Sequence, residues 1–156
     1  EKFATGTKIS GREDKYQLGY CYYKTGEYAR AIKLLEEIGA KSDILSQNIW
    51  YILGDCYLKL DNKNRAKFGF AEASKLNFDR KIQEDALFNY AKITYESSYS
   101  PFGEAIESFQ RYVDLFPGSE RIEEAYNYLV LAYLQDKNYK AALNSLDKIK
   151  NKDSKL

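Results

Sequence analysis

A pattern of large and small apolar residues recurs four times along this chain of 156 residues. Its clearest copy comprises Trp50, Leu53, Gly54, Tyr57, Ala66 and Phe70. Counted at the position of Leu53, the copies lie 35, 37 and 39 residues apart, at Leu18, Leu53, Tyr90 and Leu129. A period of this length is typical of repeat proteins, in which each unit buries its apolar face against the next unit.

Three of the copies keep one internal distance. Nine residues separate a tyrosine from an alanine in Tyr22 and Ala31, Tyr57 and Ala66, and Tyr133 and Ala142. The third copy contains Leu87, Ala91, Ala105 and Phe109, and its central stretch, 97–101, is two residues longer. The pattern therefore predicts four units of similar construction, with a longer inter-helix connection in the third unit.

Each unit is expected to be a pair of antiparallel helices, because apolar residues three and four apart form one stripe on a helix. Gly19, Gly54 and Ala91 are small where the paired helix must approach closely, and a larger side chain there would overpack the pair by ~1–3 kcal/mol. The fold class is thus all-α. The helices are expected at 12–25, 27–39, 44–60, 63–76, 80–97, 101–116, 119–136 and 138–150.

Turn-forming residues mark the ends of these helices. Stretches 25–26, 61–62 and 136–138 separate the two helices of the first, second and fourth units. Ser100-Pro101 is expected to begin the sixth helix, with Ser as the N-cap and Pro at the first helical position. The stretch 116–119, which contains Pro117 and Gly118, is expected to end the sixth helix.

These residues make the chain similar to the tetratricopeptide repeat family over 12–150, with units at about 12–45, 47–80, 84–120 and 123–150. The sequence of residues 100–134 resembles that of bacterial members of this family, which are often cell-envelope proteins. The resemblance implies a right-handed superhelix, binding of a peptide or partner protein, and no cofactor. Residues 1–11 are expected to be a lead-in, and 151–156 a tail or the start of another unit. Since no polar capping helix follows Ile149, we expect end-to-end self-association.

The resemblance also implies that the binding surface is lined by the first helix of each unit. The positions concerned are Tyr16, Tyr20, Tyr23, Tyr51, Asp55, Leu58, Phe88, Lys92, Tyr95, Asn127, Leu131 and Leu134. Tyrosine suits recognition because it offers a large contact area with few rotatable bonds and one polar tip. We expect Asp55 and Lys92 to orient a bound peptide. The alternative is that the tyrosines only pack between helices.

Composition argues against catalysis. The chain has no histidine, which is the commonest general base and metal ligand. Its carboxylates, such as Glu104 and Glu123, lie in the first turns of expected helices, where they complement the helix dipole. We therefore expect no enzyme, no metal site and no cofactor.

Charge and hydropathy also limit the partners. The net charge is +1, which gives no general attraction for nucleic acid or anionic lipid. No apolar run reaches the ~20 residues of a membrane span. Besides a protein or peptide ligand, two alternatives stay open: a carbohydrate or small ligand on the aromatic surface, and a purely structural spacer. Cys21 and Cys56 occupy equivalent positions of neighbouring units, and both are expected to be small packing residues rather than a disulfide.

Overall fold

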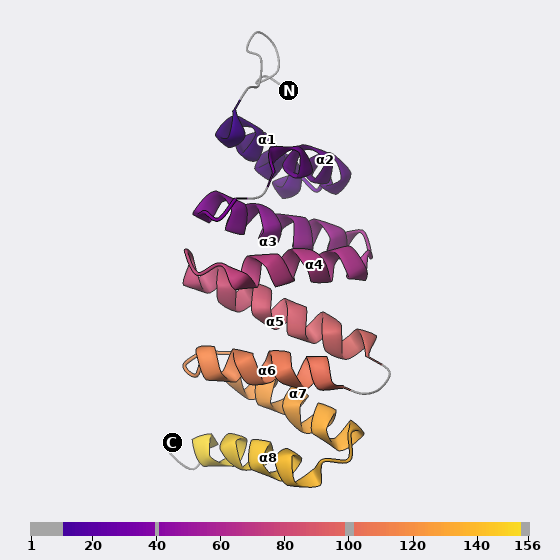
Figure 1. Ribbon diagram of the computed structural model, residues 1–156, viewed down its shortest axis with the longest axis vertical. Coiled ribbons are helices and arrows are strands. Elements are labelled where there is room, and N and C mark those ends of the chain that lie inside the picture. The colour runs from indigo at the N-terminus through magenta and orange to yellow at the C-terminus, as the bar shows by residue number, and fades with distance from the viewer. Residues whose placement is uncertain (1–10, 40, 99–101, 154–156) are drawn as a thin grey trace. The chain divides into compact units, whose positions relative to one another are not determined.

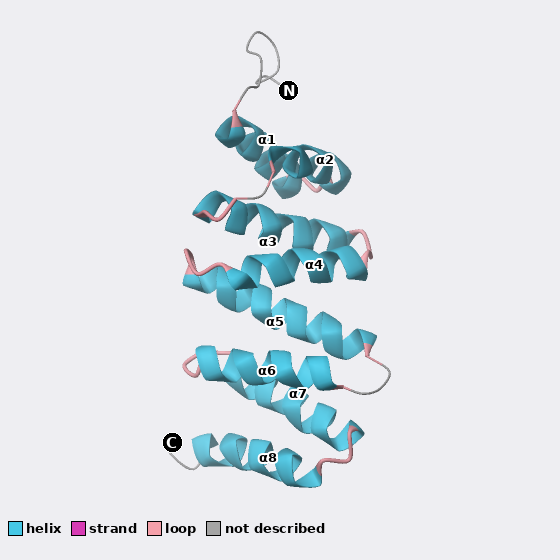
Figure 2. Cartoon of the chain, in the orientation of Figure 1, coloured by secondary structure: helices cyan, strands magenta, loops and turns pink. Residues whose placement is uncertain are grey.

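The computed structural model describes residues 11–39, 41–98 and 102–153, which form eight α-helices and contain no strand (Figures 1 and 2). Every helix end lies within three residues of its predicted position, so the predicted array of antiparallel helix pairs is confirmed. The predicted start at Ser100-Pro101 lies outside the described residues. The helices are α1 Arg12–Lys24, α2 Tyr28–Ile38, α3 Ile44–Lys59, α4 Lys63–Lys75, α5 Arg80–Ser97, α6 Gly103–Leu115, α7 Ile122–Gln135 and α8 Tyr139–Asp153.

The chain divides into two compact units, Glu1–Gln83 and Glu84–Leu156. The first contains α1 to α4. The second contains most of α5, together with α6 to α8. The last helix differs from expectation, because α8 continues to Asp153, whereas the tail was predicted to start at residue 151. The four narrower repeat boundaries remain predictions.

One type of turn closes three of the helix pairs. Gly26, Asp61 and Lys137 have positive φ values of 81°, 58° and 59°. In each turn the next residue donates its amide N–H to the carbonyl five residues earlier, at 2.8 Å. A left-handed residue with this hydrogen bond is a common way to end an α-helix, because it satisfies a terminal carbonyl. The predicted turn stretches are therefore confirmed.

The small residues lie where the helices of the first unit meet. A Cβ atom added to Gly54 would lie 2.9 Å from the Phe70 ring, and one added to Gly19 would lie 2.7 Å from Leu35. Gly69 meets backbone rather than a side chain, since its Cβ would lie 2.8 Å from the backbone nitrogen of Gly54. The pair α3–α4 thus meets backbone to backbone, which only glycine permits at this distance.

The first residues of α1 and α3 hold the loops that follow their helix pairs. Arg12 donates to Asp43 Oδ2 at 2.6 Å and to the hydroxyl of Ser46 at 2.6 Å. Gln47 is fully buried, donates to the carbonyl of Leu76 at 2.6 Å and accepts from the amide of Asp79 at 2.8 Å. Asp43 also caps α3 by accepting from the amide of Ser46. Each contact fixes where the next helix begins.

The second unit has an aromatic core. Phe109 and Tyr112 are fully buried, and Phe88 lies with its ring centre 5.3 Å from that of Tyr112. Tyr128 stacks on Phe109, with ring centres 4.7 Å apart and planes 8° from parallel. At the edge of this core, Glu84 accepts hydrogen bonds from Tyr112 and Ser119.

The two cysteines differ although they occupy equivalent positions. Both are free thiols; Cys56 is buried and Cys21 is exposed. The prediction of a small packing residue is therefore confirmed for Cys56 and wrong for Cys21. Burial and the nearby Asp55 carboxylate raise the pKa of the Cys56 thiol to about 12. Cys21 lies on α1, in which only Gly19 is buried.

Candidate functional site: a tyrosine surface on α1 and α3

Three predicted site residues form a row on one face of α1. Tyr16, Tyr20 and Tyr23 are four and three residues apart, the spacing that aligns side chains on a helix. Ring centres lie 6.2 Å apart between Tyr16 and Tyr20, and 6.4 Å apart between Tyr20 and Tyr23. The Nζ atom of Lys24 lies 5.4 Å from the centre of the Tyr20 ring, within the range of a cation–π contact. Tyr20 remains 40% exposed.

A hydrogen bond connects this row to α3. The hydroxyl of Tyr23 donates to Asp55 Oδ2 at 2.6 Å, across 32 residues of sequence. Partial burial raises the pKa of Tyr23, and the hydrogen bond to Asp55 raises it further. The hydroxyl is therefore protonated at any physiological pH and acts as a donor. This bond fixes the Tyr23 ring and the Asp55 carboxylate in one arrangement.

Tyr51 and Leu58 complete the predicted positions of the first unit. Tyr51 lies edge-on to Phe70, with ring centres 5.7 Å apart, so it is anchored to α4. Both Tyr51 and Leu58 are half-buried. We call the six residues of the first unit the tyrosine surface: Tyr16, Tyr20, Tyr23, Tyr51, Asp55 and Leu58.

In the second unit the predicted site residues differ in how far they are buried. Phe88 is 3% exposed and lies in the aromatic core, so its assignment to a binding surface is wrong. Its ring packs against Phe109 and Tyr112, and the Arg121 guanidinium lies 4.4 Å from its centre. The position of Phe88, two residues before Tyr90, was expected to face a bound partner, but here the side chain fills the core.

The remaining second-unit positions reach solvent to different extents. Tyr95 is half-buried, with its ring centre 5.2 Å from that of Tyr128. Lys92 is half-buried and Asn127 is exposed. Leu131 and Leu134 are 47% and 45% exposed. The large exposed apolar area of this set therefore comes from α7.

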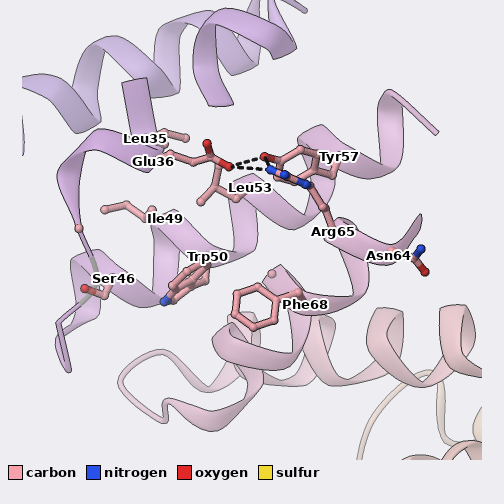
Figure 3. A pocket seen from close by; sticks show the side chains of 12 residues that line it. Leu35, Glu36, Ser46, Ile49, Trp50, Leu53, Tyr57, Asn64, Arg65 and Phe68 are labelled. Atoms are coloured by element: carbon pink, nitrogen blue, oxygen red, sulfur yellow. Dashed lines mark hydrogen bonds and ion pairs between the residues drawn. The ribbon is translucent and has the colours of Figure 1, made fainter. Parts of the chain in front are cut away.

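Sequence reasoning missed a pocket in the first unit, shown in Figure 3. The pocket has a volume of about 490 Å³ and is formed by α2, α3, α4 and the start of the α2–α3 loop. The side chains of Leu35, Ile49 and Leu53 supply apolar lining, while Trp50 and Phe68 form an aromatic wall. Their rings are perpendicular, at 87°, with centres 5.6 Å apart.

The polar end of this pocket is built from three side chains joined by hydrogen bonds (Figure 3). The Tyr57 hydroxyl donates to Glu36 Oε1 and accepts from Arg65 Nη1 at 3.0 Å. Arg65 Nη1 also lies 3.7 Å from Glu36 Oε1. Partial burial and the hydrogen bond to Glu36 raise the pKa of Tyr57. A tyrosine hydroxyl, a carboxylate and a guanidinium group thus lie together at one end of an apolar pocket.

Comparison with known proteins finds one partial match to a family model and several similar solved structures. Residues 3–69 match the family model described as anaphase-promoting complex, cyclosome, subunit 3. MamA AMB-1, in crystal form P212121, is similar with a TM-score of 0.73 and 21% identity, over 98% of this chain and 79% of that one. Another crystal structure of MamA gives a TM-score of 0.65 and 25% identity, over 93% and 74% of the two chains. No curated protein sequence matches the chain.

The chain therefore has a tetratricopeptide-like helical repeat fold. Tetratricopeptide repeats form helical arrays that typically act as non-catalytic scaffolds for protein interaction, and the fold seen here is consistent with that role. Within the described residues, no three His, Cys, Asp or Glu side chains are grouped so that they could hold a metal ion. None of the described helices has the length and apolar character to span a bilayer.

The pocket could have been found only in part from the sequence. Trp50 and Tyr57 were recognised as pattern residues that pack the pair. Phe68 is 57% exposed and lies outside the buried apolar stripe of α4. An aromatic residue outside the stripe could have indicated a binding surface there. Glu36 and Arg65 are 29 residues apart in the sequence, and no spacing rule connects them.

Proposed function

We propose that this protein is a non-catalytic scaffold that binds a protein or peptide partner through the tyrosine surface of its first unit. The observation that carries the proposal is the row of tyrosines on α1, in which Tyr20 is exposed and Tyr23 is held in place by its hydrogen bond to Asp55. The proposal includes no cofactor and no chemical step. Self-association through the ends of the chain is a separate proposal, which sedimentation velocity at increasing concentration tests.

Preorganisation favours binding at this surface. Tyr23 is held by Asp55 and Tyr51 by Phe70, so a partner would not have to immobilise these rings. Ordering a flexible side chain at an interface costs about 0.5–1.5 kcal/mol, and fixed rings avoid much of this cost. Tyr20 is the most exposed tyrosine of the row. It offers a partner the apolar area of its ring and a hydroxyl group that can form a hydrogen bond.

The Asp55 carboxylate gives the surface a direction. One of its oxygens accepts from Tyr23, and a carboxylate has further acceptor positions. A peptide N–H or a basic side chain of the partner would complement these positions. In the second unit, Lys92, Tyr95, Asn127, Leu131 and Leu134 are proposed as additional partner contacts, with the exposed leucines of α7 supplying most of the apolar area.

The experiment is a differential capture of partners from a lysate of the source cells with the full chain as bait. Native protein is compared with Tyr20→Ala and with the control Tyr139→Ala, which removes a 60% exposed tyrosine of α8. Circular dichroism confirms that all three are equally helical. We expect a protein that is retained by the native chain and the control, and whose affinity falls about tenfold or more with Tyr20→Ala, the effect of losing one hot-spot aromatic residue.

Other outcomes contradict the proposal. If every captured protein binds the Tyr20→Ala variant as tightly as the native chain, the tyrosine surface is not the binding site. A carbohydrate that binds the native chain and is not displaced by any captured protein would indicate the ligand-binding alternative. Absence of any partner or ligand would indicate a spacer.

A further inference from the structure

We propose that the pocket between α2, α3 and α4 is a second binding site, which takes one large apolar side chain from an extended, uncharged peptide segment of a partner protein. The site is distinct from the tyrosine surface. It is contained wholly in the first unit, and its lining residues come from three consecutive helices and the start of the α2–α3 loop.

The two candidate sites lie on opposite faces of α3. Successive residues of an α-helix are turned by about 100°, so Leu53 is turned by about 200° from Tyr51, and Tyr57 by the same angle from Asp55. Tyr51 and Asp55 belong to the tyrosine surface, whereas Leu53 and Tyr57 line the pocket. A partner on one face therefore leaves the other face of the helix open.

The apolar part of the pocket explains the choice of a large apolar side chain. Ile49 and Leu53 are 4% and 3% exposed, so they form a firm lining that is already packed. Phe68 is 57% exposed and stands at the rim beside Trp50. A volume of about 490 Å³ lies in the range of small-ligand pockets, and a leucine or phenylalanine side chain fits within it. Such a side chain would cover the exposed face of Phe68.

The polar end explains the choice of a peptide. Glu36 accepts a hydrogen bond from Tyr57, and Arg65 donates one to the same hydroxyl, so the acid and the base are held side by side. Their side chains are 46% and 64% exposed and are open to a ligand. A carboxylate acceptor next to a guanidinium donor complements a group with one N–H and one carbonyl oxygen. The peptide group has this pair of atoms.

The same argument disfavours charged ligands. A cationic group that approached Glu36 would be repelled by Arg65, and an anionic group that approached Arg65 would be repelled by Glu36. A neutral dipole meets both partners favourably. The pocket should therefore bind an uncharged peptide segment more tightly than an acidic or a basic one. The experiment compares peptides of these three kinds.

The test uses Trp50, which is the single tryptophan of the chain and lines the pocket. Its fluorescence is followed while the full chain is titrated with three capped peptides: acetyl-Ser-Ser-Leu-Ser-Ser-amide, and the same peptide with Asp or with Lys in place of each Ser. The variant is Phe68→Ser. Its matched control is Phe78→Ser, which removes a 50% exposed phenylalanine of the same unit that does not line the pocket.

We expect the neutral peptide to bind most tightly, and we expect Phe68→Ser to weaken that binding about tenfold, while Phe78→Ser changes it less than about twofold. Circular dichroism shows whether each variant keeps its helices, and the exposure of Phe68 makes misfolding unexpected. Because the tyrosine surface lies on the other face, Tyr20→Ala is expected to leave peptide binding unchanged.

Four results would overturn the proposal. The first is no binding of any peptide. The second is an acidic or basic peptide that binds more tightly than the neutral one at physiological salt. In the third, Phe68→Ser and Phe78→Ser have equal effects. The fourth is self-association of the chain that Phe68→Ser abolishes, which would assign the pocket to a second copy.

Discussion

The two helix pairs of the first unit follow one sequence pattern, yet they pack differently. α3 and α4 meet backbone to backbone, because Gly69 of α4 lies against Gly54 of α3. α1 meets α2 at Gly19 through the side chain of Leu35. At the position of Gly69, α2 has Leu34, whose side chain requires a wider approach.

The pairs also differ in how much of their first helix is buried. In α1 only Gly19 is buried, whereas α3 buries seven residues, including the polar Ser46 and Gln47. Within the unit α3 packs against α1, α2 and α4, while α1 packs against α2 and α3. The repeated pattern therefore determines the pairing, and the number of packed neighbours determines burial. Among the described helices of this unit, α1 has fewer packed neighbours than α3, and its Tyr20 is 40% exposed.

The largest expected effect comes from breaking the close pair. Gly69→Ala would place a Cβ 2.8 Å from the backbone nitrogen of Gly54, where no side chain can move aside. We expect a loss of about 3 kcal/mol in the free energy of unfolding, the upper range for overpacking. Urea unfolding followed by Trp50 fluorescence measures it. The control is Gly103→Ala, which meets nothing within 4 Å and should change stability by less than about 0.5 kcal/mol.

A smaller effect is expected when each pair is overpacked at its equivalent glycine. Gly54→Ala would press on the buried ring of Phe70, while Gly19→Ala would press on Leu35, which can change rotamer more readily. We expect losses of about 2 kcal/mol for Gly54→Ala and about 1 kcal/mol for Gly19→Ala in urea unfolding. Adding Phe70→Leu to Gly54→Ala should cost less than the sum of the two single changes. Equal losses at the two glycines would show that the pairs are packed alike.

Substitutions in the turns of the two pairs should change the stability still less, and in opposite directions. Gly26 closes α1–α2 with a φ of 81°, and Asp61 closes α3–α4 with a φ of 58°. Gly26→Ala should destabilise the protein by about 1 kcal/mol, because alanine is strained there. Asp61→Gly should stabilise it by about 0.5 kcal/mol, because the strain of a non-glycine residue is removed. Thermal unfolding of both variants provides the measurement, and a destabilising Asp61→Gly would contradict this account.

Acid should distinguish the loop contacts of the two pairs. Hydrogen bonds from Arg12 and from the Ser46 amide hold the pKa of Asp43 well below its usual range. In the unfolded chain the Asp43 carboxyl has its ordinary pKa of about 4, so it takes up a proton more readily than in the folded protein. The stabilisation that this contact gives is therefore complete above about pH 4, and it is lost as the pH falls through the lowered pKa of the folded protein. The Gln47 side chain, which holds the other loop, has no such titration.

We therefore expect the urea midpoint of the native chain to fall more steeply between pH 7 and pH 3 than that of Asp43→Asn. Asparagine keeps the N-cap role, so the variant should fold. Arg12→Gln should flatten the pH dependence to a similar extent, since it removes the other partner of the same pair. A native chain and an Asp43→Asn variant with parallel pH profiles would exclude this contact as the acid-sensitive one.

Much of the fold could be predicted from local spacing. The repeated pattern of large and small apolar residues, together with the turn-forming residues between them, placed all eight described helices within three residues. These features are local because a helix pair is made of consecutive segments. The contacts between pairs could not be predicted in the same way: the Tyr23–Asp55 bond and the Glu36–Tyr57–Arg65 group depend on side-chain directions across three helices.

The site residues were predicted unevenly for the same reason. Family positions placed Tyr16, Tyr20 and Tyr23 on one face of α1, which the helical period guarantees. Phe88 was assigned to a surface but fills the core, because Phe109, Tyr112 and Tyr128 gather around it. Which face of a helix is covered depends on the bulk of its neighbours, and a single position in a repeat does not contain that information.

The difference between the two cysteines has a practical chemical consequence. Thiolate is the reactive form of cysteine, and burial together with the raised pKa of Cys56 leaves that thiol almost wholly protonated and shielded at neutral pH. Cys21 is exposed and next to Tyr20. Maleimide reagents should therefore modify the native chain at one position, which places a dye or spin label beside the tyrosine row with no engineered residue. The chain thus has its own attachment point for measuring distances to whatever binds there.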